Sequence, residues 1–425
     1  MKKSSAILIV SAMIFALLLP VSIFAYGDAY ISANDPNIKY VGRWVWEEDG
    51  SVTGYFESSL EFSFTGTSIA VDFGECNGTV LFTVDGGPAK LKSYYSAKAL
   101  EFASGLENAT HFIEIHCNFQ GSCPVIKGFY LDNGCITVKS PERKSIEIIG
   151  DSISVGYVGT GFAANVNSVG TTFGYKVAKK LNMSSSTVAH GGIALSAGKN
   201  SNPDKIGMIN RYFYTGEYNT GRESTPWETS KYIPDYIILN IGFNDRCETA
   251  DEFTRFINEY TLFLQKLREA YPQTPIFCLT EFVPQYAKPI KEAVDKRVDV
   301  GDELLIYIDS SDWVADGQKN PEDGVHLLQE GHDAVAEKLY NVMKAYIDNG
   351  MKPADNKSNV TQTAATASDK NGEASSSAAT SKKSVGVPLS RGMLYLVATV
   401  AAGTAFISVI TVINKKKKRK EDEKQ

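Results

Sequence analysis

The chain has few cysteines for its length, with six among 425 residues. Small disulfide-built folds need a higher density, so this chain depends on hydrophobic cores rather than on covalent cross-links. The cysteine spacings do not match a zinc site, and the sequence contains neither a phosphate-binding loop nor a dinucleotide fingerprint. These absences predict that the protein uses neither a metal nor an organic cofactor.

Positive charge is scarce except at the two ends. The formal net charge is −6, but residues 415–425 hold seven cations and three anions, and Lys2 and Lys3 stand near the start. Without these end residues the remainder of the chain carries about −12. An acidic surface argues against a nucleic acid as partner, and it is compatible with a neutral substrate.

Long apolar stretches lie near both ends of the chain. Lys2 and Lys3 precede one that runs into small residues, which predicts a secretory signal peptide over residues 1–25, an uncleaved anchor being the alternative. Residues 392–414 are long and apolar enough for a helix across a ~30 Å hydrocarbon core. The basic tail 415–425 follows directly, and the positive-inside rule places it in the cytoplasm.

A segment of low apolar content precedes this second stretch. Residues 352–390 are rich in Ala, Ser and Thr, and they cannot bury enough apolar surface to fold, so we expect a flexible linker. Together with the two ends, this predicts a single-pass protein of the cell membrane. Its folded region would be extracellular and its C-terminus cytoplasmic.

Residues 30–140 have the pattern of strands and turns. Polar and apolar residues alternate in several short segments, as is typical of half-buried strands: 59–64, 68–73, 79–84 and 111–116. No convincing helical period interrupts them. We therefore predict an all-β sandwich of jelly-roll type.

Residues 144–350 have a different pattern, in which short apolar strands alternate with amphipathic segments. The expected strands are 146–149, 236–241, 276–279 and 304–308. The expected helices are 173–181, 251–271, a weaker one from 294 onward, and 331–347. Such alternation predicts an α/β domain whose parallel sheet has helices on both faces.

Three polar blocks follow predicted strands of this domain. They are Gly150-Asp151-Ser152, Gly242-Phe243-Asn244-Asp245 and Asp323-Gly324-Val325-His326. A serine alone is a weak signal, because its hydroxyl needs a neighbouring base and donors aimed at the oxyanion that forms. Here a hydroxyl, an amide, a carboxylate and an imidazole occur in an order that an open α/β sheet can bring together. The blocks therefore predict acyl-transfer chemistry.

The three blocks, with a glycine at Gly192, resemble the four motifs of the SGNH/GDSL hydrolase superfamily over roughly residues 145–348. The preceding sandwich, with Tyr40-Val41-Gly42-Arg43-Trp44 near its start, resembles carbohydrate esterase family 2, whose members place a jelly roll before an SGNH domain. The resemblance implies a flavodoxin-like SGNH sheet. It also implies a serine esterase that removes O-acetyl groups from a xylan- or mannan-type polysaccharide through an acyl-enzyme. We expect a monomer with an acetylated polysaccharide as its substrate.

The same resemblance assigns roles to individual residues. Ser152 would be the nucleophile, His326 the base and Asp323 the carboxylate that orients it. The oxyanion donors would be the N–H groups of Ser152 and Gly192 and the side-chain amide of Asn244. Two alternatives stay open: the neighbouring glycine could supply the second N–H, and some relatives orient the histidine without a carboxylate, as a Ser–His dyad.

Two other functions also stay open. An SGNH lipase or acylhydrolase would act on longer acyl chains, but no segment around Ser152 or Asn244 is obviously apolar. A surface carbohydrate-binding protein with an inactive hydrolase body is the other alternative, and the presence of Ser152, Asn244 and His326 argues against it. Hydrolysis of a chromogenic acetate ester would separate the enzymes from the binding protein.

Overall fold

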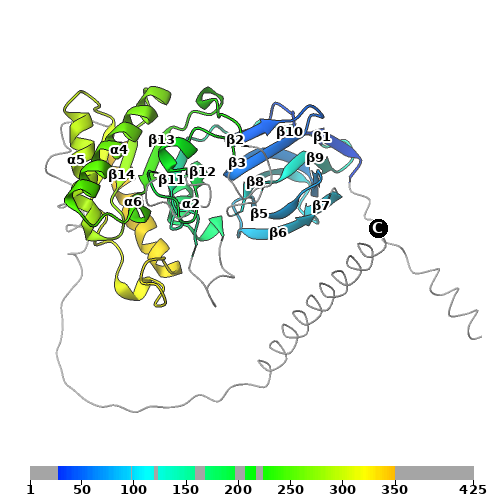
Figure 1. The fold of residues 1–425 in the computed structure, drawn as a ribbon. Coiled ribbons are helices and arrows are strands. Elements are labelled where there is room, and N and C mark those ends of the chain that lie inside the picture. The colour runs from blue at the N-terminus through cyan, green and yellow to red at the C-terminus, as the bar shows by residue number, and fades with distance from the viewer. Residues whose placement is uncertain are drawn as a thin grey trace, which may run out of the picture. The chain divides into compact units, whose positions relative to one another are not determined.

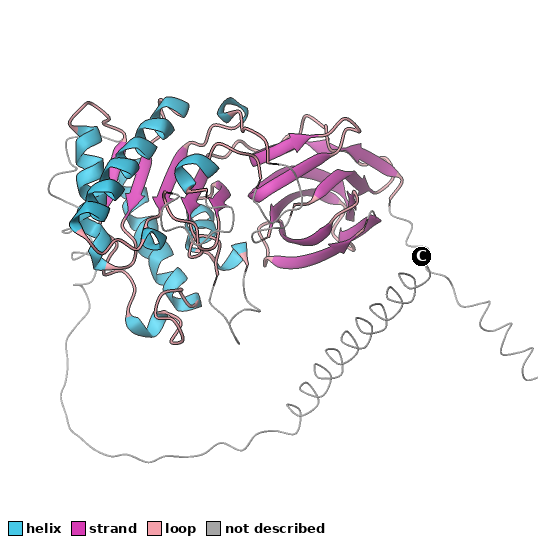
Figure 2. Ribbon diagram, in the orientation of Figure 1, coloured by secondary structure: helices cyan, strands magenta, loops and turns pink. Residues whose placement is uncertain are grey.

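The computed structural model describes residues 27–349, apart from 97, 119–122, 158–167, 197–205 and 217–223. An all-β domain comes first and a domain of alternating strands and helices follows it (Figure 1). Among the described residues, the helices in Figure 2 lie in the second domain. The predicted fold class, an all-β sandwich before a parallel α/β sheet, is therefore confirmed.

The first domain is a barrel-like antiparallel sandwich. Its strands are β1 (Ala29–Ser32), β2 (Lys39–Trp46), β3 (Val52–Gly66), β4 (Ile69–Phe73), β5 (Asn77–Val84), β6 (Lys90–Tyr95), β7 (Lys98–Ala103), β8 (Ala109–Cys117), β9 (Val125–Leu131) and β10 (Thr137–Val138). The order is β6-β5-β8-β3-β9-β4-β7, with β1 paired to β9 and with β2 and β10 paired to β3. Large apolar side chains fill its centre, among them Trp44, Phe62, Phe73 and Phe129.

The second domain contains a five-stranded parallel sheet. Its strands are β11 (Ser145–Gly150), β12 (Ser184–Ala189), β13 (Tyr236–Asn240), β14 (Ile276–Leu279) and β15 (Leu305–Ile308). They lie in the order β12-β11-β13-β14-β15, and all neighbours are parallel. This is the flavodoxin-like order. The chain adds β12 on one side of β11 and then β13, β14 and β15 on the other side, so the carboxyl ends of β11 and β13 flank the usual ligand position.

Helices cover both faces of this sheet. They are α2 (Phe173–Lys180), α3 (Met208–Arg211), α4 (Ala250–Ala270), α5 (Ala287–Val298) and α6 (Gln329–Asp348), with short 3₁₀ turns η2 (Val169–Thr171), η3 (Thr229–Lys231), η4 (Phe243–Asp245), η5 (Pro284–Tyr286) and η6 (Asp316–Gln318). Side chains of a strand alternate between faces. Ile237 and Leu239 accordingly pack with α4 and α5, whereas Tyr236 and Ile238 pack with α2 and α6.

The predicted location in the cell membrane is wrong. The two longest helices of the described part, α4 and α6, are amphipathic and carry many charged residues. Across the residues that the structure describes, no helix combines the length and the apolar character needed to cross a bilayer. The segments predicted as signal peptide (1–25), linker (352–390), membrane span (392–414) and cytoplasmic tail (415–425) lie outside the described residues.

Strand β12 was not expected from the sequence, because its residues Ser184-Ser185-Ser186-Thr187 read as a loop. All six of its residues are nevertheless buried. The hydroxyls have partners in the sandwich: Ser184 Oγ donates to Glu61, and Ser59 Oγ donates to the carbonyl of Ser185 at 2.8 Å. A polar strand is stable at this edge because the neighbouring domain satisfies its side chains.

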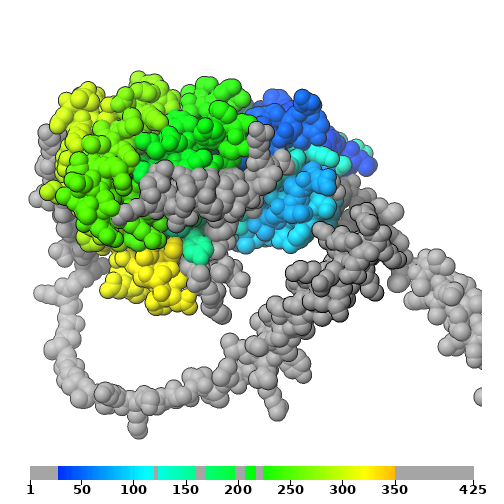
Figure 3. Space-filling view, in the orientation of Figure 1, coloured from blue at the N-terminus to red at the C-terminus, as the bar shows by residue number. Residues whose placement is uncertain are grey.

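An arginine of the sandwich reaches into the second domain. The fully buried Arg43 on β2 forms an ion pair with Glu147 of β11 at 3.4 Å and donates to the carbonyl of Tyr212 at 2.6 Å. Its guanidinium also lies 4.6 Å from the centre of the Tyr212 ring. Space-filling atoms show the two domains in direct contact (Figure 3). The sandwich is thus part of the packing of the strand that leads to Ser152.

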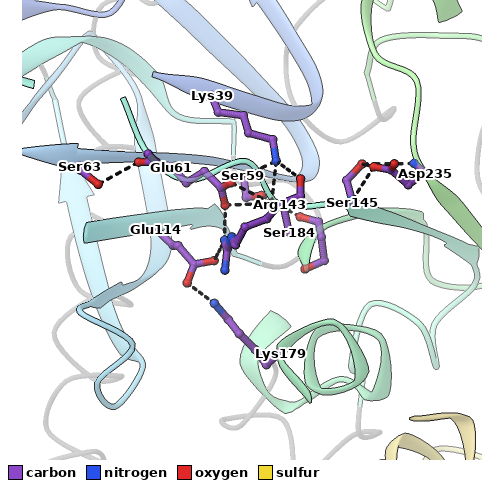
Figure 4. A network of polar contacts seen from close by, with 12 residues as sticks. Lys39, Ser59, Glu61, Ser63, Glu114, Arg143, Ser145, Lys179, Ser184 and Asp235 are labelled. Atoms are coloured by element: carbon purple, nitrogen blue, oxygen red, sulfur yellow. Dashed lines mark hydrogen bonds and ion pairs between the residues drawn. The ribbon is translucent and has the colours of Figure 1, made fainter. Parts of the chain in front are cut away.

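A second ion network joins the domains beside the short connection between them (Figure 4). Arg143 contacts both Glu61 and Glu114, and the distance to Glu114 is 2.6 Å. Lys179 of α2 also contacts Glu114. Burial alone would raise the pKa of Glu114, but the charges of Lys179 and Arg143 outweigh it and lower that pKa to about 2.

Replacing Glu114 by glutamine is expected to lower the free energy of unfolding by roughly 3 kcal/mol at pH 7, because a shift from 4.5 to about 2 is worth about 1.4 kcal/mol per pKa unit. A depressed carboxyl pKa stabilises the fold above pH 4.5, and this contribution is lost as the pH falls toward 2. The difference between the variant and the wild type should therefore shrink in acid. Urea unfolding at a series of pH values measures it.

The matched control is Glu142→Gln, since that side chain is 87% exposed and pairs with Lys139, outside the network. Its replacement should change the stability by no more than about 0.5 kcal/mol at any pH. Equal losses in the two variants would show that the contacts of Glu114 do not stabilise the domain interface.

Candidate active site

Ser152 lies in a tight turn directly after β11. Gly150 is required there, because a Cβ atom at this position would lie 2.0 Å from Ser154 Oγ and 2.8 Å from the carbonyl oxygen of Asn240. The turn is held by backbone hydrogen bonds from Tyr157 N to Ser152 O and from Val155 N to Asp151 O. Only 9% of Ser152 is exposed. The serine is thus fixed at the carboxyl edge of the sheet, beside the end of β13.

His326 reaches Ser152 from the loop between η6 and α6. Its Nε2 atom lies 2.9 Å from Ser152 Oγ, and its Nδ1 atom lies 2.7 Å from Asp323 Oδ2. The other carboxylate oxygen of Asp323 accepts the backbone N–H groups of Val325 and His326. Although burial opposes it, the hydrogen bond from His326 lowers the pKa of Asp323, so this carboxylate is ionised at neutral pH. The structure thus brings together the three residues predicted as nucleophile, base and orienting acid.

The predicted oxyanion residues come from two loops beside the serine. Gly192 follows β12 and has φ of +74°, a conformation that favours glycine. Asn244 lies in η4, after β13, and is almost fully buried. Its Nδ2 atom donates to Asp151 Oδ2 and to the carbonyl of Ile193, both at 3.1 Å. Because both amide hydrogens have acceptors, an oxyanion would have to compete with one of them.

The loop that holds Asn244 is itself closely packed. A Cβ atom on Gly242, whose φ is +143°, would lie 2.8 Å from the ring of Phe256 on α4, so glycine is needed here as well. Asp245 accepts the backbone N–H of Leu195 at 2.8 Å and that of Ser196 at 3.3 Å. It therefore ties η4 to the loop that carries Gly192, and both loops are positioned as one unit.

Residues 148–334 match the GDSL-like lipase/acylhydrolase family. The chain contains a GDSL-like hydrolase domain. The match extends from β11 to the second turn of α6, so it includes the serine, the amide and the histidine described above. The resemblance to this superfamily that the sequence motifs indicated is confirmed, whereas the roles of the individual residues stay predictions.

Two relatives extend the likeness beyond the GDSL domain. A cellulase/esterase, CelE, of Acetivibrio thermocellus is 28% identical over 259 residues, which are 58% of this chain and 31% of that protein. The chain thus matches less than a third of that relative's length. An acetylxylan esterase/glucomannan deacetylase of Cellvibrio japonicus is 24% identical over 335 residues, which are 75% of this chain and 91% of that protein.

Solved structures share the fold of both domains. A family two carbohydrate esterase from Clostridium thermocellum, in complex with cellohexaose, has a TM-score of 0.60 at 24% identity, over 73% of this chain and 99% of that one. An acetyl xylan esterase from the rumen bacterium Butyrivibrio proteoclasticus has a TM-score of 0.65 at 16% identity, over 75% and 98%. At these identities the likeness concerns the fold: a β domain followed by a GDSL domain.

The structure excludes some residues of the GDSL domain from the site and adds others. Tyr212 and Trp227 are buried against Arg43, so their rings are not available to stack on a sugar. His332 is fully buried, and desolvation lowers its pKa to about 3, so it packs as a neutral ring.

Tyr157 is an addition that the motifs did not reveal. Its ring centre lies 4.7 Å from that of His326, with the ring planes at 74°. This residue lies five positions after Ser152 in the same turn, and the edge-to-face contact limits the orientations that the imidazole can adopt.

Within the described ranges, no group of three or more metal-ligating side chains occurs.

Proposed function

We propose that this chain is a serine carbohydrate O-acetyl esterase, which removes acetyl groups from a polysaccharide of the xylan or mannan type. The observation that carries the proposal is the continuous hydrogen-bonded series from Asp323 through His326 to Ser152, with distances of 2.7 and 2.9 Å. The two relatives, a cellulase/esterase and an acetylxylan esterase/glucomannan deacetylase, support the acyl group and the substrate class.

In the first half of the reaction Ser152 Oγ attacks the acetyl carbonyl carbon. His326 Nε2, which lies within hydrogen-bonding distance, takes the hydroxyl proton, and Asp323 stabilises the imidazolium that forms. The carbonyl oxygen becomes an oxyanion next to Asn244 and the loop of Gly192. When the tetrahedral intermediate collapses, the sugar oxygen leaves with the proton from His326, and the acetyl group stays on Ser152.

The second half repeats these steps with water in place of the serine. His326 removes a proton from water, whose oxygen attacks the acetyl carbonyl, and the same donors stabilise the second oxyanion. Collapse returns the proton to Ser152 Oγ and releases acetate. Removal of a single oxyanion donor costs roughly 3–4 kcal/mol of transition-state stabilisation in serine hydrolases. Because such a donor is worth this much, we infer that Asn244 gives up its hydrogen bond to one of its two present acceptors and donates to the oxyanion instead.

Acetate release from acetylated xylan, mannan, glucomannan and peptidoglycan tests the substrate class. We expect release from at least one plant-type polysaccharide, none from the same polymer after alkaline deacetylation, and none with the Ser152→Ala protein. Release from a chromogenic acetate ester but from none of the polymers would leave an esterase without the proposed carbohydrate substrate.

Activity on p-nitrophenyl esters is expected to fall steeply from acetate to butyrate and to be almost absent at octanoate. A pocket that fits an acetyl group makes each added methylene costly by overpacking, on the order of 1–3 kcal/mol. The lack of an apolar lid-like segment near residues 150–154 and 242–245 motivates this expectation. The measurement is kcat/KM across the series, and an octanoate value equal to or above that of acetate would replace the deacetylase by a lipase.

A further inference from the structure

A buried carboxyl group that the proposed mechanism does not use lies behind the oxyanion loop. Glu281 follows β14, two residues after the strand ends, and only 1% of it is exposed. Strand β13 pairs with β11 on one side and with β14 on the other. The segments after these three neighbouring strands therefore bring Asp151, Asn244 and Glu281 to the same edge of the sheet.

The two carboxyl groups differ in their hydrogen bonds. Asp151 is fully buried and accepts the backbone N–H of Ile153 at 3.0 Å and the side-chain amide of Asn244 at 3.1 Å. Neither carboxyl oxygen of Glu281 accepts a hydrogen bond of good geometry within the described part of the chain, although the backbone N–H of Phe243 acts on Glu281 to favour its charged form. Hydrogen bonds to the charged form favour ionisation. A single negative charge shared by this pair therefore resides on Asp151, and the proton resides on Glu281.

The surroundings of Glu281 also oppose its ionisation. Burial, and then the negative charge of Asp151, raise the pKa of Glu281 well above its usual value. Burial likewise raises the pKa of Asp151, and it raises the pKa of Asp245 to about 6. The titratable groups that act on this cluster include further acids: Asp245 in η4, Cys247 after it, Glu259 and Tyr260 on α4, and Tyr286 in η5.

We propose that Glu281 is a positioning residue for ester hydrolysis: as an uncharged acid, it lets one carboxylate, Asp151, hold the Asn244 amide at the oxyanion site. A second negative charge beside Asp151 would oppose the developing oxyanion, because like charges repel strongly in a buried environment. A second carboxylate would also compete with the oxyanion for the N–H groups of the Asn244 amide. The proposal rests on the proposed function, since it concerns the same site.

The test compares Glu281→Gln with the wild-type chain, using kcat/KM for p-nitrophenyl acetate between pH 5 and 10. Glutamine keeps the size and stays neutral, so near pH 6 the two proteins should agree within about threefold. At higher pH the wild type should lose roughly tenfold in kcat/KM as Glu281 ionises, and the variant should keep its plateau. Identical profiles, with or without an alkaline loss, overturn the proposal.

The matched control is Glu292→Gln on α5, where the side chain is about half exposed and pairs with Lys296. This variant should reproduce the wild-type profile, including its alkaline loss. An alkaline plateau in this control as well would mean that the loss does not come from Glu281.

Stability supplies a readout that does not depend on activity. A carboxyl whose folded-state pKa is raised stabilises the fold fully below its unfolded value of about 4.5, and this contribution is lost as the pH rises toward the folded-state pKa. Glu281→Gln should therefore gain in unfolding temperature relative to the wild type from pH 5 to 8. A constant difference would show that Glu281 holds no proton. Absence of wild-type hydrolysis would instead refute the proposed function, while the unfolding series would still report on the proton.

Discussion

Replacing Ser152 by alanine is expected to lower kcat for acetyl-ester hydrolysis by roughly 10⁵- to 10⁶-fold, as in serine hydrolases that lose their nucleophile. The hydroxyl of Ser152 is the group within hydrogen-bonding distance of His326 Nε2, at 2.9 Å, so its loss leaves the base without a proton to remove. The fold should persist, because the turn depends on backbone hydrogen bonds and on Gly150. The measurement is kcat for p-nitrophenyl acetate, together with the unfolding temperature.

Ser154→Ala provides a control in the same turn. Its hydroxyl is buried and has no hydrogen-bond partner among the described residues, so its removal should leave kcat within about threefold of the wild type and should not destabilise the fold. If Ser152→Ala keeps more than a few per cent of the wild-type turnover, another group is the nucleophile.

Asp323→Asn is expected to lower kcat by on the order of 10⁴-fold, with little change in stability. Asparagine keeps an oxygen that can accept the N–H groups of Val325 and His326, so the loop should hold its shape. It replaces the carboxylate oxygen, 2.7 Å from His326 Nδ1, by an amide donor, which favours the wrong tautomer of the imidazole. Steady-state kinetics of the full chain with an acetate ester measure the loss.

Glu322→Gln provides the control, because it removes a carboxylate of the same loop that does not contact His326. Glu322 is exposed, and its backbone N–H donates to Asn320 Oδ1. The kcat of this variant should stay within about twofold of the wild type. A loss of less than about tenfold in Asp323→Asn would assign the site to a Ser–His dyad. This alternative is tested because about a third of the Asp323 side chain is exposed.

Much of the fold and the polar blocks of the site could be predicted because both follow from local patterns. The apolar runs that became β11, β13, β14 and β15 are flanked by glycine and polar residues, and parallel strands place such residues at one edge. Ser152 and His326, 174 positions apart, meet for this reason. The proximity of Asp323 to His326 is more local still, because the two lie in one short loop.

The elements that the sequence hid depend on contacts between distant segments. Strand β12 reads as a polar loop until Glu61 and Ser59 of the sandwich are placed against it. Helix α5 begins at Ala287, seven residues before the expected start, because Pro289 falls in its first turn, where proline is tolerated. Neither position carries a local signal that distinguishes it from a loop.

The site shows the same limit. Sequence spacing could not reveal that Asn244 already donates both amide hydrogens, to Asp151 and Ile193, or that Glu281 is buried beside them. Glu281 belongs to no motif, and its environment follows from the order of the strands. The ring of Tyr157 against His326 could have been suspected only from its place in the turn after Ser152.

The position of β12 at the edge of the parallel sheet has a consequence for synthesis of the chain. A bare edge strand offers unpaired backbone groups to the same strand of another molecule, and this is a common route to aggregation. Here the sandwich covers that strand, with Ser59 bound to the backbone of Ser185. Domains fold in order as the chain is made, so the sandwich precedes residues 184–189. We therefore expect the N-terminal domain to be folded and able to cover this edge when the hydrolase sheet forms.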